Sequence, residues 1–170
     1  MTAMAGGVTE AMAALLEYPS AQFPELLEAC RAAVATGAPE IAGGVDQFAA
    51  SIAGLSRAQL QELYTETFDF SERCTMDIGW HLFGDRHERG MFLSELRPAL
   101  AAAGIDERLE LPDHLPYVLT LLSRSDPSRV TELRPMVQRA VEKLMTNLHE
   151  RQSPYEHLVG SVVAAATRGA

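Results

Sequence analysis

The sequence predicts an all-α protein built as a single-domain helical bundle. Apolar residues recur at helical spacing along almost the whole chain, and no convincing run alternates as a β-strand would. Short loops join the predicted helices, which favours antiparallel neighbours. The chain has 170 residues, of which 47% are hydrophobic and 22% charged, so residues 1–170 suit one globular domain that needs no disulfide or metal to hold it together.

The first half of the chain predicts four helices, with the approximate spans 9–17, 24–36, 39–54 and 57–68. Pro24 suits the first turn of the second helix, and Gly37 suits its end. Glycines at positions 43 and 44 weaken the third helix. Ser56 and Gln59 have the spacing of a capping box, in which each side chain binds the backbone N–H of the other residue, and this pair opens the fourth helix.

The second half predicts five more helical segments, with the approximate spans 75–83, 85–103, 113–123, 128–150 and 153–167. Thr75 and Asp113 are the expected N-caps of the first and third of these. Asp126 and Pro127 open the longest helix, whose apolar residues recur at steps of three and four. Because Pro135 lies inside that span, we expect a kink or a late start there.

The charge of the chain is strongly acidic at its N-terminal end. The formal net charge is −9, and residues 1–70 contain nine acidic but only two basic side chains. Nucleic acid is therefore an unsuitable partner, because its phosphates require a basic surface. A cationic partner such as a basic peptide fits better, although an acidic surface also serves solubility alone. No apolar run approaches the roughly 20 residues of a membrane span, and residues 1–16 lack the basic start of a secretory signal, so we expect a cytoplasmic protein.

Few residues have the spacing of a catalytic or metal site. There is no H-E-x-x-H motif, no E-x-x-H pair for a metal site in a bundle, and no G-x-S-x-G motif. Cys30 and Cys74 stand alone and are expected to be small buried thiols. His81, next to Trp80, is expected to be a partly buried histidine that forms a hydrogen bond. We therefore expect a protein without catalytic residues or metal ligands, with a helical enzyme or metal-binding protein as the alternative.

Two segments combine aromatic, charged and proline residues more densely than the rest. Residues 68–90 indicate either core aromatics with ion pairs or a peptide groove with an apolar floor and a charged rim. Residues 110–117, Glu-Leu-Pro-Asp-His-Leu-Pro-Tyr, form a rigid helix start, because the two prolines fix φ and Asp113 caps. His114 and Tyr117 carry polar groups that need partners and are available to face a ligand.

Three segments, taken in order and spacing, resemble the NarJ-type nitrate reductase assembly chaperones (nitrate reductase delta subunits) within the TorD-like family of molybdoenzyme chaperones. The segments are Tyr64–Phe70, His81–Asp85 with Arg89 after it, and Glu110–Pro116. The resemblance covers about residues 10–160. It implies an all-helical cytoplasmic chaperone of the TorD-like type, which is not an enzyme and not a subunit of the finished reductase.

The resemblance also implies the partners. They are the catalytic (alpha) subunit of respiratory nitrate reductase, bound through its N-terminal peptide and in its apo form, and molybdenum cofactor biosynthesis proteins. The chaperone would assist insertion of the molybdenum cofactor before the subunit docks at the membrane. The client carries molybdopterin guanine dinucleotide, and no cofactor is expected to bind the chaperone stably. An alternative client is another molybdoenzyme, such as a selenate, chlorate or dimethylsulfoxide-type reductase.

Six polar positions are implied by the matching motifs as partner-binding residues. They are Asp85, Arg89, Glu110, Asp113, His114 and Tyr117.

Overall fold

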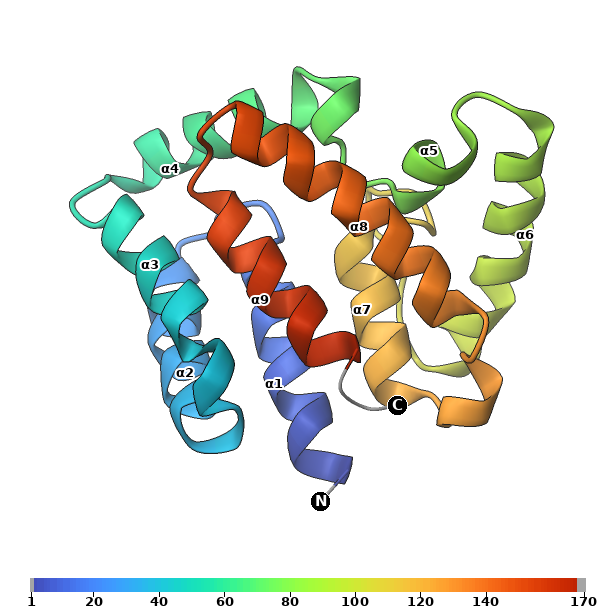
Figure 1. The fold of residues 1–170 in the computed structure, drawn as a ribbon, viewed down its shortest axis with the longest axis horizontal. Helices are drawn as coiled ribbons and strands as arrows, with labels where there is room; N and C mark the ends of the chain where they lie inside the picture. The colour runs from blue at the N-terminus through green and yellow to red at the C-terminus, as the bar shows by residue number, and fades with distance from the viewer. Residues whose placement is uncertain (1, 168–170) are drawn as a thin grey trace.

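The structure, a computed structural model, describes the backbone of residues 2–167 and the side chains of residues 7–165. All regular structure in that range is helical, which confirms the predicted all-α class (Figure 1). The α-helices are α1 Thr2–Leu15, α2 Phe23–Gly37, α3 Ala42–Ile52, α4 Arg57–Tyr64, α5 Ile78–Phe83, α6 His87–Ala102, α7 Leu115–Arg124, α8 Leu133–Glu150 and α9 Tyr155–Thr167. The shorter turns are η1 Pro39–Ile41, η2 Thr65–Asp69, η3 Glu72–Cys74 and η4 Pro127–Arg129.

Helix α7 is the most deeply enclosed helix, because it is buried along most of its length and packs against α1, α6 and α9. The chain wraps around it: α1 also packs against α2, α3 packs against α9, and α8 packs against α9 and α5. Figure 1 shows α8 and α9 in front of α1 and α7, with α6 at the far edge. The N-terminal end of α1 and the C-terminal end of α9 lie at the same end of the bundle (Figure 1). Buried apolar side chains from Val8 to Val162 form one continuous core.

A buried aromatic cluster joins the two halves of the chain. The ring of Tyr155, at the start of α9, lies 5.1 Å from that of Phe48, 4.8 Å from that of Phe68 and 6.1 Å from that of Tyr64, measured between centroids. Such edge-on and tilted arrangements are the favoured geometry of aromatic pairs. Phe68 belongs to the π-helical turn η2, so this cluster also holds in place the segment that follows α4.

Most predicted helix ends are confirmed. Gln59 N donates to Ser56 Oγ and Ser56 N donates to Gln59 Oε1, so the capping box opens α4 as expected. Asp126 does cap, by accepting from Ser128 N at 2.9 Å, but it opens the short turn η4 and not, as the sequence predicts, the longest helix. The long helix has the late start rather than the kink: α8 begins at Leu133, so Pro135 falls in the first turn, where its missing N–H has no consequence.

Two predicted N-caps are wrong. Helix α5 begins at Ile78 instead of near Thr75, whose hydroxyl accepts from Asp77 N. Asp113 does not cap α7: His114 precedes that helix, and the Asp113 carboxylate binds groups on α5 and α6 instead. A charged guanidinium offers a carboxylate a stronger hydrogen bond than a neutral amide of its own helix does. The predicted helix 57–68 also changes character at Thr65, where the π turn begins.

The isolated cysteines and His81 have the surroundings that the sequence predicts. Cys30 and Cys74 are buried and not in a disulfide, and burial raises the pKa of the Cys30 thiol to about 11. A thiol with so high a pKa is a poor nucleophile near neutral pH. His81 Nε2 donates to Thr75 O at 2.7 Å, and burial lowers the pKa of its imidazole. Among the described residues, none of the helices combines the length and the apolar character needed to span a bilayer.

An ion pair ties α1 to the end of α7. The Glu10 carboxylate accepts from Arg124 Nε at 3.0 Å, from Arg124 Nη2 at 3.2 Å and from Ser123 Oγ at 3.1 Å. The hydrogen bond from Arg124 lowers the pKa of Glu10 more than partial burial raises it. A carboxylate with a lowered pKa stabilises the fold above its ordinary pKa of 4.5, and this contribution disappears as the pH falls through the lowered value.

We therefore expect Glu10→Gln to lower the free energy of unfolding by about 0.5–1 kcal/mol near pH ~7, and by less near pH ~3. The expected change in the free energy of unfolding is small because solvent screens the half-exposed pair of Glu10 and Arg124. Urea unfolding at both pH values measures the difference. Glu62→Gln, which changes an exposed carboxylate of α4, is the control. An equal loss of stability at both pH values would show that the charge of Glu10 is not what stabilises the contact between α1 and α7.

Candidate functional site

Residues 110–117 do not form a free loop, because the chain before α7 pairs with the chain before α5. Leu115 N donates to Met76 O at 2.8 Å, and Ile78 N donates to Asp113 O at 3.0 Å. Asp77 and His114 thus lie opposite each other as an antiparallel pair. This pairing brings the side chains of two distant segments into one place.

The carboxylate of Asp113 is fully buried at the centre of a charged network. Its Oδ2 accepts from Gly79 N at 3.0 Å and from Arg89 Nε at 3.2 Å, and Arg89 Nη2 also reaches Asp77 Oδ2 at 3.0 Å. A Cβ on residue 79 would lie 2.5 Å from Asp113 Oδ2, so this approach requires glycine. The Arg89 guanidinium also lies 5.7 Å from the centre of the Trp80 ring, a cation–π distance. The network therefore joins α5, α6 and the chain before α7.

The two carboxyl groups that share Arg89 have opposite pKa shifts. Burial raises the pKa of Asp113, and the charge of Asp77 raises it further, against the effect of Arg89. Burial also acts to raise the pKa of Asp77, but His114 and Arg89 together lower it below its ordinary value. Asp77 is thus the carboxylate that stays ionised more readily, and Asp113 is the one that accepts a proton first.

His114 and Tyr117 lie between this network and the surface. The side chain of His114 is almost fully buried; its Nδ1 is 3.9 Å from Asp77 Oδ1, a distance that allows a charge contact but is too long for a hydrogen bond. Its Nε2 has no hydrogen-bond partner among the described residues. The rings of His114 and Tyr117 meet edge to face at 5.4 Å, and Tyr117 Oη accepts from Arg108 N at 3.2 Å.

Two adjoining hollows open above these residues. The larger, of about 620 Å³, lies between α1, the loop before α2, α4 and the chain around Leu109, and Tyr117 lines it. The smaller, of about 290 Å³, lies beside η2 and η3, and His114 lines it. Tyr64 and Glu110 line both, so the two hollows adjoin, and we call them together the acidic groove.

The acidic groove combines carboxylates with exposed apolar side chains. Its carboxylates outnumber its two basic side chains, Arg108 and Arg124; they are Glu10, Glu17, Asp69, Glu72, Asp77 and Glu110. Leu109 is 97% exposed and Tyr18 is 53% exposed, and both line the larger hollow. The arrangement suits a ligand that presents positive charge and an apolar surface together.

The structure brings five of the six predicted positions together and leaves one apart. Glu110, His114 and Tyr117 line the acidic groove, and Arg89 and Asp113 lie in the network beneath it. Asp85 is exposed in the turn between α5 and α6 and lines neither hollow. No sequence motif marks Tyr18, Glu17, Glu72 or Leu109, which also line the groove. One sequence feature indicates this surface: Leu109 is an apolar residue that lies in a loop between the charged residues Arg108 and Glu110.

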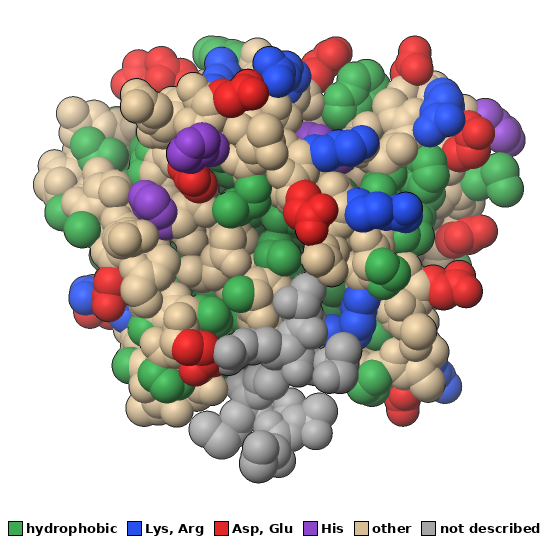
Figure 2. Space-filling view, viewed as in Figure 1, with side chains coloured by type: hydrophobic (Ala, Val, Ile, Leu, Met, Phe, Trp, Pro, Cys, Tyr) green, Lys and Arg blue, Asp and Glu red, His purple; other side chains and the backbone are tan. Residues whose placement is uncertain are grey.

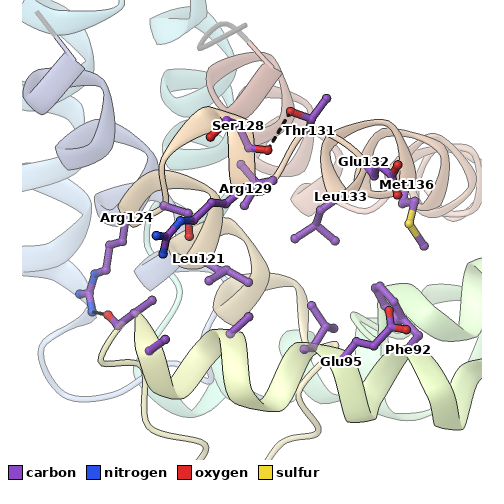
Figure 3. A pocket seen from close by; sticks show the side chains of 16 residues that line it. Phe92, Glu95, Leu121, Arg124, Ser128, Arg129, Thr131, Glu132, Leu133 and Met136 are labelled. Atoms are coloured by element: carbon purple, nitrogen blue, oxygen red, sulfur yellow. Dashed lines mark hydrogen bonds between the residues drawn. The ribbon is translucent and has the colours of Figure 1, made fainter.

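A separate cavity of about 640 Å³ lies between α6, the end of α7 and the start of α8. Figure 3 shows Phe92 on α6 facing Leu133 and Met136 of α8 across it, with Glu95 and Arg129 at its edges. None of the six predicted positions lines this cavity. Nor does any group of three His, Cys, Asp or Glu side chains within the described part of the chain come close enough to hold a metal ion.

Comparisons with known proteins agree with these segments. A protein-family model described as nitrate reductase delta subunit matches residues 31–158. The probable nitrate reductase molybdenum cofactor assembly chaperone NarJ of Bacillus subtilis (strain 168) is 27% identical over 157 residues, which cover 91% of this chain and 85% of that protein. The nitrate reductase molybdenum cofactor assembly chaperone NarJ of Escherichia coli (strain K12) is 28% identical over 146 residues, which cover 83% of this chain and 61% of that protein.

A third relative shows the same segment within a longer protein. The nitrate reductase-like protein NarX of Mycobacterium tuberculosis (strain ATCC 25618 / H37Rv) is 27% identical over 134 residues, which cover 74% of this chain but 21% of that protein. The family match extends over most of the chain and includes all three segments on which the resemblance rests. The protein therefore belongs to the nitrate reductase delta subunit family, as those segments predict.

Proposed function

We propose that this protein is an assembly chaperone for a nitrate reductase and not an enzyme. In this proposal it binds the N-terminal segment and the apo form of the catalytic subunit in the cytoplasm, assists insertion of the molybdenum cofactor, and releases the subunit before it docks at the membrane. Family membership and the names of the relatives, which describe a non-enzymatic role, support it. The observation that carries the proposal is the acidic groove with its exposed apolar residues.

The acidic groove fits an amphipathic peptide better than a small molecule. Leu109 and Tyr18 leave apolar surface in water, and covering it stabilises a complex by about 25 cal/mol for each Å² buried. The surrounding carboxylates attract a basic partner and speed its encounter with the groove. By contrast, acidic and basic side chains are interspersed on the face that α8, α9, α2 and α3 present in Figure 2. Ordering a flexible peptide costs entropy, so we expect moderate affinity and ready release.

The predicted positions take different parts in this proposal. Glu110, His114 and Tyr117 face the client, while Arg89 and Asp113 position the chain that carries them. Asp85 would contact the client only if the complex extends to the α5–α6 turn. Residues 1–170 act as one helical domain, and molybdopterin guanine dinucleotide stays with the client. Molybdenum cofactor biosynthesis proteins are the further partners. The names of the relatives favour nitrate reductase over a selenate, chlorate or dimethylsulfoxide-type reductase as the client enzyme.

Titration calorimetry with a synthetic peptide tests the proposal. The probe is about the first 20 residues of the nitrate reductase catalytic subunit from the same genome, long enough for an amphipathic helix. We expect a Kd in the micromolar range that rises at high salt, because exposed charges are then screened. Leu109→Ser should raise the Kd by about fivefold to tenfold, since it removes an apolar contact worth about 1 kcal/mol. Met91→Ser, at a half-exposed apolar residue of α6 outside the groove, should leave the Kd unchanged.

Two results would contradict the proposal. If neither the peptide nor the whole apo subunit binds, the protein is not a chaperone of this client. If the peptide binds equally well to the Leu109→Ser protein and to the unmodified protein at both salt concentrations, the acidic groove is not the binding surface.

A further inference from the structure

We infer that the smaller hollow of the acidic groove is a pocket for a single arginine side chain of the bound peptide. The inference rests on the proposed function, since it specifies which chemical group of the client this part of the groove recognises. It is carried by two independent observations: an unbalanced set of carboxylates and a buried imidazole nitrogen without a partner.

The carboxylates of this hollow are not balanced by basic residues. Four of its lining residues are acidic, Asp69, Glu72, Asp77 and Glu110, and none is Lys or Arg. Asp77 is bound by Arg89, whereas the other three have no hydrogen bond or ion pair with another described side chain. Like charges gathered around one hollow repel each other, and an entering cation relieves that repulsion.

The negative potential reaches the buried wall of the hollow. Burial raises the pKa of Tyr64, and the charges of Asp69, Glu17 and Glu110 raise it further, since a phenolate would have to form among carboxylates. A group that carries positive charge is favoured at the same place for the same reason.

His114 supplies a hydrogen-bonding group that the protein itself leaves unused. It lines the hollow and is 4% exposed, and in the neutral tautomer that carries its proton on Nδ1 the other ring nitrogen, Nε2, is an acceptor. Nε2 has no partner among the described residues. Buried polar atoms are nearly always hydrogen-bonded in native proteins, so such an atom indicates a donor that arrives with a ligand. An arginine N–H is a donor of this kind.

The walls of the hollow favour arginine over lysine. Glu110 and Glu72 supply carboxylates for the several N–H groups of a planar guanidinium, which can bind more than one carboxylate oxygen at once. Lysine offers a compact, strongly hydrated ammonium that uses several separate carboxylates less completely. The volume of about 290 Å³ takes one long side chain and not the backbone of a helix, which would lie in the larger hollow.

The first test needs no client. N-acetyl-arginine methylamide, and its neutral citrulline analogue, are titrated into protein with labelled histidines, and the imidazole resonances of His114 are followed by NMR. We expect a saturable shift with the arginine probe alone, and its loss in the Glu72→Gln/Glu110→Gln protein. Glu66→Gln, at an exposed acid of η2 outside the hollow, should leave it unchanged. No saturable shift, or the same shift with citrulline, overturns the inference.

The second test links the pocket to the peptide. Each arginine of the client peptide is replaced in turn by citrulline and by lysine, and the Kd is measured with unmodified and with Glu72→Gln/Glu110→Gln protein. We expect one position where citrulline raises the Kd about tenfold in the first protein and less than twofold in the second. Equal binding of the lysine peptide would contradict the assignment to arginine.

These outcomes separate the inference from the proposed function. A peptide that binds tightly, with no arginine coupled to Glu72 and Glu110, would refute the pocket and leave the chaperone role intact. An arginine probe that saturates the hollow, with no binding of the peptide or the apo subunit, would refute the client and leave the pocket intact.

Discussion

Replacing Asp113 with alanine should lower the free energy of unfolding by about 2–4 kcal/mol. The change removes the buried partner of Arg89 and leaves the N–H of Gly79 buried without an acceptor. Breaking a buried ion pair from one side costs more than the pair contributes, because the remaining charge stays desolvated. Asp77 still binds Arg89, which keeps the expected loss below that of a fully orphaned charge.

Urea unfolding followed by circular dichroism measures this effect, with two matched variants. Asp85→Ala changes an exposed acid in the α5–α6 turn and should alter stability by less than about 0.5 kcal/mol. Asp113→Asn keeps an acceptor for Gly79 but loses the charge, and should fall between the two. An Asp113→Ala protein as stable as the Asp85→Ala protein would show that the network does not hold α5, α6 and the start of α7 together.

Gly44→Ala should also destabilise the protein, by about 2–3 kcal/mol. Gly44 lies where α3 packs against α9, and a Cβ there would meet the Ser161 hydroxyl and lie 2.9 Å from His157 O. The hydroxyl can rotate away, but the carbonyl belongs to the backbone of α9 and cannot. The overlap thus outweighs the helix propensity that alanine gains, about 1 kcal/mol.

The neighbouring glycine provides a control with the opposite sign. Gly43 is exposed on the same helix, and a Cβ there would meet nothing within 4 Å. Gly43→Ala should therefore stabilise the protein by about 0.5–1 kcal/mol, through helix propensity and a less flexible unfolded chain. Thermal unfolding of both variants, compared with the unmodified protein, measures the two changes in melting temperature. If Gly44→Ala raises the melting temperature as Gly43→Ala does, the α3–α9 contact is not as close as the structure describes.

The helices could be predicted where the deciding interactions are local. Ser56 and Gln59 bind amides of their own helical turn, so their spacing is sufficient information. Asp113 differs because its partners, Gly79 and Arg89, lie 34 and 24 residues away along the chain. A local sequence pattern contains no information about such distant donors. It therefore predicts that the Asp113 carboxylate caps its own helix, α7. The two adjacent glycines illustrate the same limit, since only packing against α9 distinguishes Gly44 from Gly43.

The site could be predicted only in part, because the acidic groove is assembled from distant segments. The Glu110–Tyr117 segment stood out through its prolines and polar side chains. Tyr18 and Glu17 reach the groove only through the packing of α1 against α7, and Glu72 reaches it through the turn after η2. Leu109 lies in a loop, where periodicity carries no information about burial.

The position of α1 and α9 in the bundle allows this helical unit to be fused to, or inserted into, another polypeptide. Because α1 begins and α9 ends at the same end of the bundle, the unit can be joined to or placed within a longer polypeptide without disturbing its core (Figure 1). In the Mycobacterium tuberculosis relative, the matching segment makes up 21% of the protein, so the similar segment there is part of a longer chain. In a fused chain, a tether would set the local concentration of whatever lies next to the helical unit, so that even a weakly binding groove could remain occupied.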